Sequence, residues 1–445
     1  MRYGLDSSSQ QLWQRTQQVV WHPCTQMKQQ QAIPPLAVVR GEGIWLYDGD
    51  GKRYLDAISS WWVNLFGHAH PVINAALRDQ LEQIAHVMLA GCTHEPVVRL
   101  SEQLTRLSGL AHVFYASDGA SATEIALKMS FHYWRNVGKP DKTRFVSLRN
   151  GYHGETLGAL AVTDVAIFKM VYAPLLQSSS QVMSPDWRLA EAGESAEAYA
   201  RRAAQELGAY LAQHQQTVAA VILEPLVQCA AGMAMYHPTY LREVRALCNQ
   251  YSVHLIADEI AVGFGRTGTL FACEQAGVTP DLMCLSKGIT AGYLPLSAVL
   301  ATEEIYAAFY ADDMAHAFLH SHSYTGNPLA CRAAIASLGL FESEHVLTEN
   351  RRRGDVLDRL AEPLRQHPRV RHFRRLGMIW AFDVMNVAQD FAQQFYRAAL
   401  QEGLLLRPIG NTVYFMPPYI VEEADMAYLI AGTVKALERT LQTTG

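Results

Sequence analysis

Short apolar runs alternate with amphipathic stretches through the middle of the chain. Runs rich in β-branched and apolar residues begin at His112, Arg144, Thr217, Val253 and Asp281, and each predicts a buried strand. Residues 119–135, which follow the first run, carry an apolar stripe at helical spacing. Because strands alternate with helices from about 110 to 300, the pattern predicts an α/β fold with a mostly parallel sheet covered on both faces.

Three other regions have a different pattern. Residues 43–58 alternate around a glycine-rich turn and predict a hairpin. Residues 178–216 are rich in Ala, Glu, Ser and Gln and predict a surface excursion with an exposed helix. The C-terminal part predicts helices at 328–343, 347–365, 387–402 and 422–442, with strands near 376–384, 404–409 and 412–416. We therefore expect an N-terminal arm with part of a small domain over 1–66, a large domain over 67–327, and the rest of a small α+β domain over 328–445.

Composition excludes several classes of protein. The formal net charge is −5 and no basic block is present, which argues against nucleic acid and membranes as partners. No apolar run approaches the roughly 18 residues of a membrane span, and the N-terminal stretch lacks the apolar core of a signal peptide. The seven cysteines include no CxxC pair, and His68 and His70 lack companion ligands. We expect a cytoplasmic protein that acts on small molecules and has no metal site.

Two of the predicted strands end at residues with complementary chemistry. The run from Val253 ends at Asp258, and the run from Asp281 ends at Lys287. Open α/β sheets bind ligands at the carboxyl ends of their strands. A lysine amine can form a Schiff base with the aldehyde of pyridoxal phosphate, and a carboxylate opposite the ring nitrogen keeps that nitrogen protonated. The pair therefore favours pyridoxal phosphate as the cofactor.

The string DEIAVGFGRTG, followed downstream by LSKG, resembles the class III (ω) aminotransferases of fold type I. The resemblance implies a large domain with a seven-stranded sheet, Lys287 as the Schiff-base lysine, and Asp258 facing the pyridine nitrogen. It also implies that the backbone amides of Gly119 and Ala120 hold the cofactor phosphate. Tyr152 is expected to stack on the ring and contact substrate, while its neighbour His153 is a weaker candidate.

Further site residues are implied only by the resemblance. Glu224 is expected near the aspartate, and Gln228 near a ring oxygen. The stretch HSHSYTGNP is expected to cross to a neighbouring subunit, with Ser323 and its neighbour His322 at the partner's phosphate and Ser321 at the substrate. This arrangement predicts a homodimer with active sites at the subunit interface.

The substrate pocket is expected to include Trp61, with Arg407 binding a carboxylate through its planar fork. The marks WHPCTQM, ISSWW and RPIGNTVYFMPPYI resemble members of the class that serve biotin synthesis. These enzymes move an amino group from S-adenosylmethionine to 8-amino-7-oxononanoate and form 7,8-diaminononanoate. Cys24 lies where some members have a substrate-recognising tyrosine, so recognition at that point is expected to differ.

Three alternatives remain at this stage. The first is an ω-aminotransferase that uses lysine or another diamine as donor. The second is a nucleotide-binding oxidoreductase, suggested by GFGRTG, although this string has neither the GxGxxG nor the GxxxxGK[ST] spacing. The third is a binding protein that keeps the fold without catalysis. The presence of both Lys287 and Asp258 favours an enzyme.

Overall fold

The computed structural model describes residues 8–177 and 179–443. By its internal contacts the chain divides into two units. The small unit comprises the described residues up to Pro71, Arg352–Phe373 and the described residues from Phe382 onward, and the large unit comprises Val72–Arg351 and Arg374–Ala381. The division expected from the sequence placed a boundary after residue 327, whereas the helix that follows this residue lies in the large unit.

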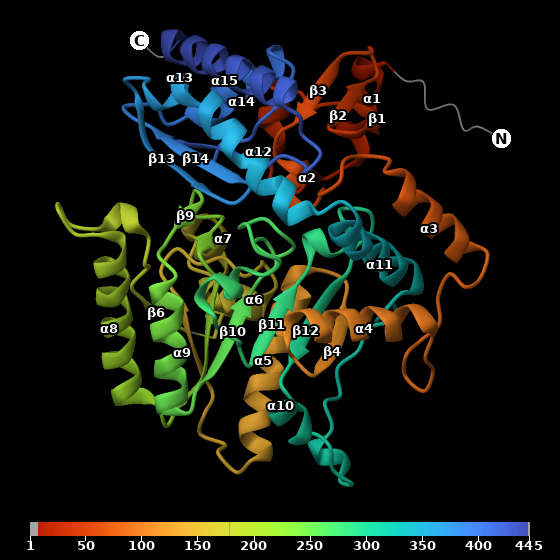
Figure 1. The fold of residues 1–445 in the computed structure, drawn as a ribbon, viewed down its shortest axis with the longest axis vertical. Helices are drawn as coiled ribbons and strands as arrows, with labels where there is room; N and C mark the ends of the chain where they lie inside the picture. The colour runs from red at the N-terminus through yellow and green to blue at the C-terminus, as the bar shows by residue number, and fades with distance from the viewer. Residues whose placement is uncertain (1–7, 178, 444–445) are drawn as a thin grey trace. The chain divides into compact units, whose positions relative to one another are not determined.

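A seven-stranded sheet forms the centre of the large unit (Figure 1). The strand order is β4-β12-β11-β10-β7-β5-β6, and β12 runs antiparallel to both of its neighbours while the other pairs are parallel. The prediction of a mostly parallel sheet is confirmed. The strands are β4 (His112–Ala116), β5 (Arg144–Leu148), β6 (Ser180–Val182), β7 (Val218–Leu223), β10 (His254–Asp258), β11 (Leu282–Leu285) and β12 (Ser297–Ala301).

Helices pack on this sheet through apolar stripes. In α5 (Gly119–Asn136) the residues Ala122, Ile125 and Ala126 are fully buried, and the helix contacts strands β7, β10, β11 and β12. Helices α8 (Ala196–His214) and α9 (Thr239–Tyr251) pack side by side (Figure 1). The other helices of this part are α3 (Pro71–Leu81), α4 (Glu95–Ser108), α6 (Leu157–Val162), α7 (Ala166–Lys169), α10 (Glu303–Ala307) and α11 (Pro328–Ser343).

Short elements complete the loops of the large unit. A two-stranded ribbon is formed by β8 (Val227–Gln228) and β9 (Ala234–Met235). The 3-10 helices are η2 (Met170–Leu175), η3 (Trp187–Leu189), η4 (Ala272–Ala276), η5 (Lys287–Thr290) and η6 (Met314–His316).

The expectation for residues 178–216 was wrong in part. Residues Ser180–Val182 form the edge strand β6, which pairs with β5. Helix α8 is not an exposed helix, because Tyr199, Leu207 and Leu211 are buried on one side of it. An edge strand pairs on one side only and can be short, and the many alanines of α8 make a weak apolar stripe. For both reasons, a segment of polar composition gave no sequence signal for the edge strand β6 or for the buried side of α8.

The small unit contains a four-stranded sheet in the order β1-β2-β3-β15. The predicted hairpin is confirmed as β2 (Trp45–Asp48) and β3 (Arg53–Asp56), and β3 pairs in parallel with β15 (Leu404–Leu405). A second sheet pairs β13, β14 and β16 in that order. The remaining elements are α1 (Ser9–Val19), η1 (Met27–Gln31), β1 (Val38–Glu42), α2 (Ser59–Trp62), α12 (Val346–Leu360), α13 (Glu362–Arg365), β13 (Val370–Leu376), β14 (Ile379–Val384), α14 (Phe391–Gln401), β16 (Thr412–Phe415) and α15 (Glu423–Thr443).

Three C-terminal expectations need correction. The helix expected over 347–365 is two helices separated at Ala361. Pro363 lies in the first turn of the second helix. The strand expected near 376–384 is the second arm of a hairpin, and its first arm β13 carries several charged residues that masked it. The hairpin turns at Gly377, whose φ is 58° and where a Cβ would lie 2.3 Å from backbone of Thr267. The strand expected at 404–409 is only Leu404–Leu405.

Candidate active site

Strand β10 delivers Asp258 to the carboxyl end of the central sheet. This aspartate is buried, with its Oδ2 2.7 Å from Nδ1 of the equally buried His153. A carboxylate only accepts hydrogen bonds at neutral pH, so His153 donates from Nδ1. The amide of Ile260 donates to the other oxygen at 3.1 Å. These two bonds hold the carboxylate in one orientation.

The adjacent Glu259 has a different role. Its two oxygens accept hydrogen bonds from the amides of Ala272 and Cys273, at 2.9 and 2.8 Å. Those amides lie at the start of η4, where backbone donors have no partner within the helix. Burial raises the pKa of Glu259 to about 7. Of the acidic pair that ends the strand, Glu259 therefore anchors the following glycine-rich turn.

Lys287 begins η5, shortly after the neighbouring strand β11 ends. Its φ is 45°, a left-handed conformation that few residues other than glycine adopt. Burial lowers the pKa of its amine, and the negative charge of Asp258 opposes this effect. The structure thus brings the two residues predicted from the strand ends into electrostatic contact. A desolvated lysine is more often neutral, and only the neutral amine acts as a nucleophile or base.

Glu224 follows β7 and joins the same buried group. Its carboxylate accepts hydrogen bonds from the amides of Tyr152 and Cys229, at 3.0 and 2.9 Å. Burial raises its pKa to about 7, against the opposing effect of His153, while the charge of Asp258 adds to the rise. Its position matches the expectation that it lies near the aspartate.

The segment 152–154 lies against the start of α5. Gly154 has a φ of 125°, and a Cβ there would lie 2.6 Å from the Cβ of Ala120. The oxygen of His153 accepts a hydrogen bond from Thr123 Oγ1 at 2.9 Å, which fixes this turn to the helix. The ring of Tyr152 is half-buried, and its hydroxyl donates to Glu155 at 2.9 Å. Tyr152 is therefore close to the helix start, with its ring partly accessible.

The start of α5 offers backbone donors. Gly119 and Ala120 are its first residues, and the side chain of Asp118 caps the helix by accepting from the amide of Ser121 at 3.0 Å. A Cβ on Gly119 would lie 3.0 Å from Ile260, two residues after Asp258. Amides in the first turn of a helix have no partner within the helix, and the helix dipole favours an anion there. This end of α5 fits a phosphate.

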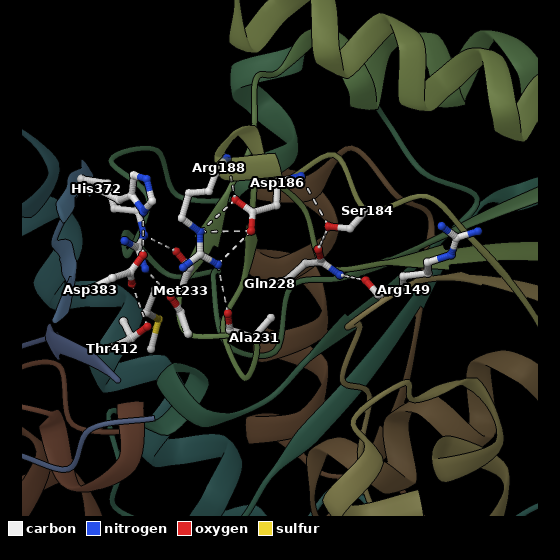
Figure 2. Close-up of polar contacts among 12 residues, drawn as sticks. Arg149, Ser184, Asp186, Arg188, Gln228, Ala231, Met233, His372, Asp383 and Thr412 are labelled. Atoms are coloured by element: carbon white, nitrogen blue, oxygen red, sulfur yellow. Dashed lines mark hydrogen bonds and ion pairs between the residues drawn. The ribbon is translucent and has the colours of Figure 1, made fainter. Parts of the chain in front are cut away.

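Gln228 ends the short strand β8 and has several polar contacts (Figure 2). Its amide oxygen accepts from Ser184, and its amide nitrogen donates to the carbonyl oxygen of Arg149 at 2.9 Å. In the turn after β8, the carbonyl oxygen of Ala231 accepts from Arg188 of η3 at 3.2 Å. Because both ends of its side chain are engaged, Gln228 is a structural residue in this conformation.

The stretch 321–323 meets the turn that precedes α5 of the same chain. His322 accepts from the amide of Tyr324 at Nδ1, and its Nε2 lies 3.5 Å from the hydroxyl oxygen of Ser117. The carbonyl oxygen of Ser323 accepts from His86 at 2.6 Å. Ser321 and Ser323 are exposed.

Three of the expected substrate residues, Cys24, Trp61 and Arg407, lie together in the small unit, whereas Tyr152 and Ser321 belong to the large unit. The guanidinium carbon of Arg407 lies 4.7 Å from the centre of the Trp61 ring, a cation–π distance. Arg407 also donates to the carbonyl oxygen of Cys24 at 3.4 Å. All three residues are exposed. The contact with Cys24 uses its main chain, which the side-chain difference from tyrosine does not affect.

His153 is the site residue that the sequence analysis underrated. Its position directly after Tyr152 in RNGYHG was the available signal. Its bond to Asp258 joins residues that are far apart in the sequence, so no local pattern could reveal it.

The fold and these residues define a class. A mostly parallel sheet that presents a desolvated lysine beside a buried aspartate, near a helix start open to a phosphate, suits enzymes that use pyridoxal phosphate. The family model described as aminotransferase class-III matches residues 26–437, and the chain belongs to this family. The expectation of a class III aminotransferase is thereby confirmed.

Individual relatives narrow the comparison. The chain is 44% identical to an adenosylmethionine-8-amino-7-oxononanoate aminotransferase of Helicobacter pylori, covering 94% of this chain and 96% of the relative. It is 39% identical to an enzyme of the same name from Geobacter sulfurreducens, covering 97% and 98%.

Solved structures of two kinds are similar. An adenosylmethionine-8-amino-7-oxononanoate aminotransferase of Methanocaldococcus jannaschii has a TM-score of 0.90 and 34% identity, covering 96% of this chain and 98% of that chain. The ω-transaminase of Pseudomonas jessenii in complex with PMP has a TM-score of 0.93 and 30% identity, covering 98% and 99%.

Proposed function

We propose that this protein transfers an amino group from S-adenosylmethionine to 8-amino-7-oxononanoate, forming 7,8-diaminononanoate for biotin synthesis, with pyridoxal phosphate as cofactor. The observation that carries the enzymatic part is the buried Asp258, held by His153, together with the nearby Lys287, whose amine pKa burial lowers. The substrates are supported by the relatives of that name, which match the chain over nearly its full length. They are also supported by the exposed Arg407, which lies on the Trp61 ring and can bind the carboxylate of a substrate.

Each residue has a distinct part in this proposal. Pyridoxal phosphate supplies an aldehyde that binds amines and a ring that takes up the electron pair left when a proton departs from the carbon beside the nitrogen. Lys287 would hold the cofactor covalently through Nζ and, as a free amine, would accept and return that proton at the same atom. Its lowered pKa favours the neutral amine that proton acceptance requires. Asp258 keeps a proton on the ring nitrogen, and His153 positions Asp258.

Binding roles fall to the neighbouring elements. The amides of Gly119 and Ala120 hold the phosphate at the start of α5. Tyr152 covers the ring and contacts the substrate. Arg407 binds a substrate carboxylate, and Trp61 contacts the aliphatic chain. The thiol of Cys24 is shorter than the phenol of a tyrosine, so contact with substrate at that position requires a bridging water or a neighbouring residue.

We also propose a homodimer in which Ser321, His322 and Ser323 contribute to the partner's active site. Support comes from the stretches 167–175 and 310–324, which expose large apolar side chains. Exposed apolar patches of this kind mark interfaces. Leu175, Met314 and Leu319 line one cavity of about 780 Å³, so the two stretches lie close together. The most exposed of these side chains are Ile167, Met170, Val171, Leu175, Tyr310, Met314, Leu319 and Tyr324. A second copy of the chain is the proposed cover for this apolar face.

The proposed location is the cytoplasm. All seven cysteines lie in the described ranges and none of them is joined in a disulfide, which fits a reducing compartment. Among the described helices, none is sufficiently long and apolar to span a membrane. Fractionation of cells that make the protein checks this location, and recovery in an extracytoplasmic fraction would contradict it.

The function is tested by its two half-reactions. Addition of S-adenosylmethionine to the yellow holoenzyme is expected to bleach the cofactor's absorbance band, and 8-amino-7-oxononanoate is expected to restore it, as a ping-pong mechanism requires. Lys287→Ala is the control, which should retain the cofactor noncovalently but show no turnover. The same holoenzyme should sediment with the mass of two chains, and a monomer with full activity would refute the shared site.

Other outcomes separate the remaining assignments. If lysine bleaches the band and S-adenosylmethionine does not, the acceptor stands and the donor is wrong. If 8-amino-7-oxononanoate fails to restore the band, the protein is an ω-aminotransferase with another acceptor, as the similarity to ω-transaminase structures allows. Normal turnover by Lys287→Ala would refute the assignment of the catalytic lysine.

A further inference from the structure

Four consecutive residues of the small unit have a left-handed backbone. The φ angles of Ser59, Ser60, Trp61 and Trp62 are 52°, 47°, 72° and 74°. Non-glycine residues visit this region singly, because Cβ then lies close to the following carbonyl oxygen. A run of four therefore requires surrounding contacts that hold it in place, and such strained segments cluster at functional sites.

Asp56 supplies the main contacts to this left-handed turn. It ends β3 and is fully buried. One of its oxygens accepts from the amide of Ser60 at 2.8 Å, and the other accepts from the hydroxyl of Ser60 at 2.6 Å and from Nε2 of His68 at 3.0 Å. We call Asp56, Ser60 and His68 the aspartate clamp. Hydrogen bonds to a carboxylate are roughly twice as strong as neutral ones, so the clamp can hold a conformation that the chain disfavours.

The turn separates two adjacent tryptophans. The ring nitrogen of Trp62 donates to the hydroxyl of Tyr414 at 3.1 Å, and Trp62 is buried. Trp61 is 43% exposed, and its ring lies against the guanidinium of Arg407. In a regular strand or helix, neighbouring side chains point in directions fixed by its period. The left-handed turn instead sends one indole into the core and presents the other to Arg407.

We propose that Asp56 and Ser60 are positioning residues for substrate recognition, which hold Trp61 against Arg407 so that the arginine presents its fork to the substrate carboxylate. This inference rests on the proposed function, because it takes Arg407 as the carboxylate-binding residue. The clamp acts through Trp61 and touches neither the cofactor nor the substrate. It therefore controls the affinity for carboxylate substrates and leaves the chemical step unchanged.

Two substitutions test the clamp against a matched control. Asp56→Asn keeps the shape of the side chain but weakens the hydrogen bonds that it accepts. Ser60→Ala removes the hydroxyl that donates to Asp56. The control is Asp48→Asn, which alters another buried aspartate of the same sheet. Asp48 accepts from the amides of Asp50 and Lys52 and from the hydroxyl of Tyr54, at 3.0, 2.8 and 3.0 Å, and it has no bond to the left-handed turn.

The expected result is a split between KM and kcat. Asp56→Asn and Ser60→Ala should raise the KM for 8-amino-7-oxononanoate at least tenfold and change kcat less than twofold. Activity toward an acceptor ketone without a carboxylate should fall less than activity toward the oxononanoate, because such a ketone loses only the contact with Trp61, and the absorbance of the bound cofactor should remain as in the wild type. Asp48→Asn should lower the melting temperature without raising the KM. In an Arg407→Ala background, Asp56→Asn should raise the KM by a smaller factor than it does in the wild type, because the clamp acts on the carboxylate through Trp61 and Arg407.

Several outcomes would overturn the proposal. It fails if both clamp variants melt earlier but keep the wild-type KM, if Asp48→Asn raises the KM equally, or if the effects of Asp56→Asn and Arg407→Ala multiply. If Asp56→Asn does not fold, Ser60→Ala carries the test, and Ser60→Gly is its comparison: glycine accepts the left-handed backbone without the clamp, so its KM should rise less than that of Ser60→Ala.

One measurement is independent of the substrate. Near-ultraviolet circular dichroism of the holoenzyme should lose the contribution of Trp61 in Asp56→Asn, with the size of that contribution given by the difference between wild type and Trp61→Phe. If the wild-type enzyme does not use the oxononanoate, the proposed function fails while this spectrum still tests the clamp. An unchanged spectrum in Asp56→Asn refutes the clamp alone.

Discussion

Replacement of His153 by phenylalanine isolates the bond that orients Asp258. Phenylalanine is close to histidine in size but cannot donate a hydrogen bond, so Asp258 keeps only the amide of Ile260 among its described donors. The lost bond is 2.7 Å long, buried and charge-assisted. Bonds of this kind contribute about 1.5–3 kcal/mol. Because about 1.4 kcal/mol corresponds to a tenfold change, we expect a loss of roughly 10- to 150-fold.

The loss should appear where Asp258 acts on the cofactor. Single-turnover spectrophotometry with excess donor measures the rate of the first half-reaction, and titration of the apoenzyme with pyridoxal phosphate measures cofactor affinity. The control is His254→Phe, which removes another buried histidine, at the start of β10, bonded to the hydroxyl of Ser130 at 2.9 Å and stacked on Trp134. This control should lower stability only. If His153→Phe stays within threefold of the wild type in both measurements, the orienting role of His153 is wrong.

Two further predictions concern charge. Arg407→Ala should raise the KM for carboxylate substrates by about 10- to 150-fold, from the loss of a charge-assisted contact, without changing the cofactor's spectrum. An unchanged KM contradicts this role. Glu224 has a pKa of about 7 in the folded protein, where burial is the main cause, against 4.5 as its ordinary value. The unfolded chain then binds fewer protons between these values, so stability falls as pH rises from 4.5 to 7, by up to roughly 3 kcal/mol. Glu224→Gln should remove this part of the slope in urea unfolding at pH 5 and pH 8, whereas an unchanged slope refutes it.

The central sheet was predictable because its strands are buried on both faces. The runs that became β7, β10 and β11 are continuous and apolar, which only a covered parallel sheet explains well. The edge strand β6 and the hairpin arm β13 were not predicted. Both contain polar or charged residues, and their strand conformation depends on pairing with a partner that no local pattern identifies.

The site shows the same division. Asp258 and Lys287 were found from the sequence because each stands at the end of an apolar run. The bond between His153 and Asp258 and the aspartate clamp depend on contacts that arise only in the folded chain. The left-handed turn that separates the adjacent Trp61 and Trp62 carries no glycine to signal it. Tertiary contacts, not local preference, impose that conformation.

The order of strands in the four-stranded sheet has a consequence for synthesis of the protein. Residue 55 of β3 pairs with residue 404 of β15, whereas the last strand of the seven-stranded sheet ends at Ala301. Translation proceeds from the N-terminus, and domains tend to fold as units while it does so. The seven-stranded sheet can therefore form on the ribosome before β15, the last strand of the four-stranded sheet, has been synthesised. A chaperone that shields the apolar side of the β2–β3 hairpin would have its longest opportunity during that interval.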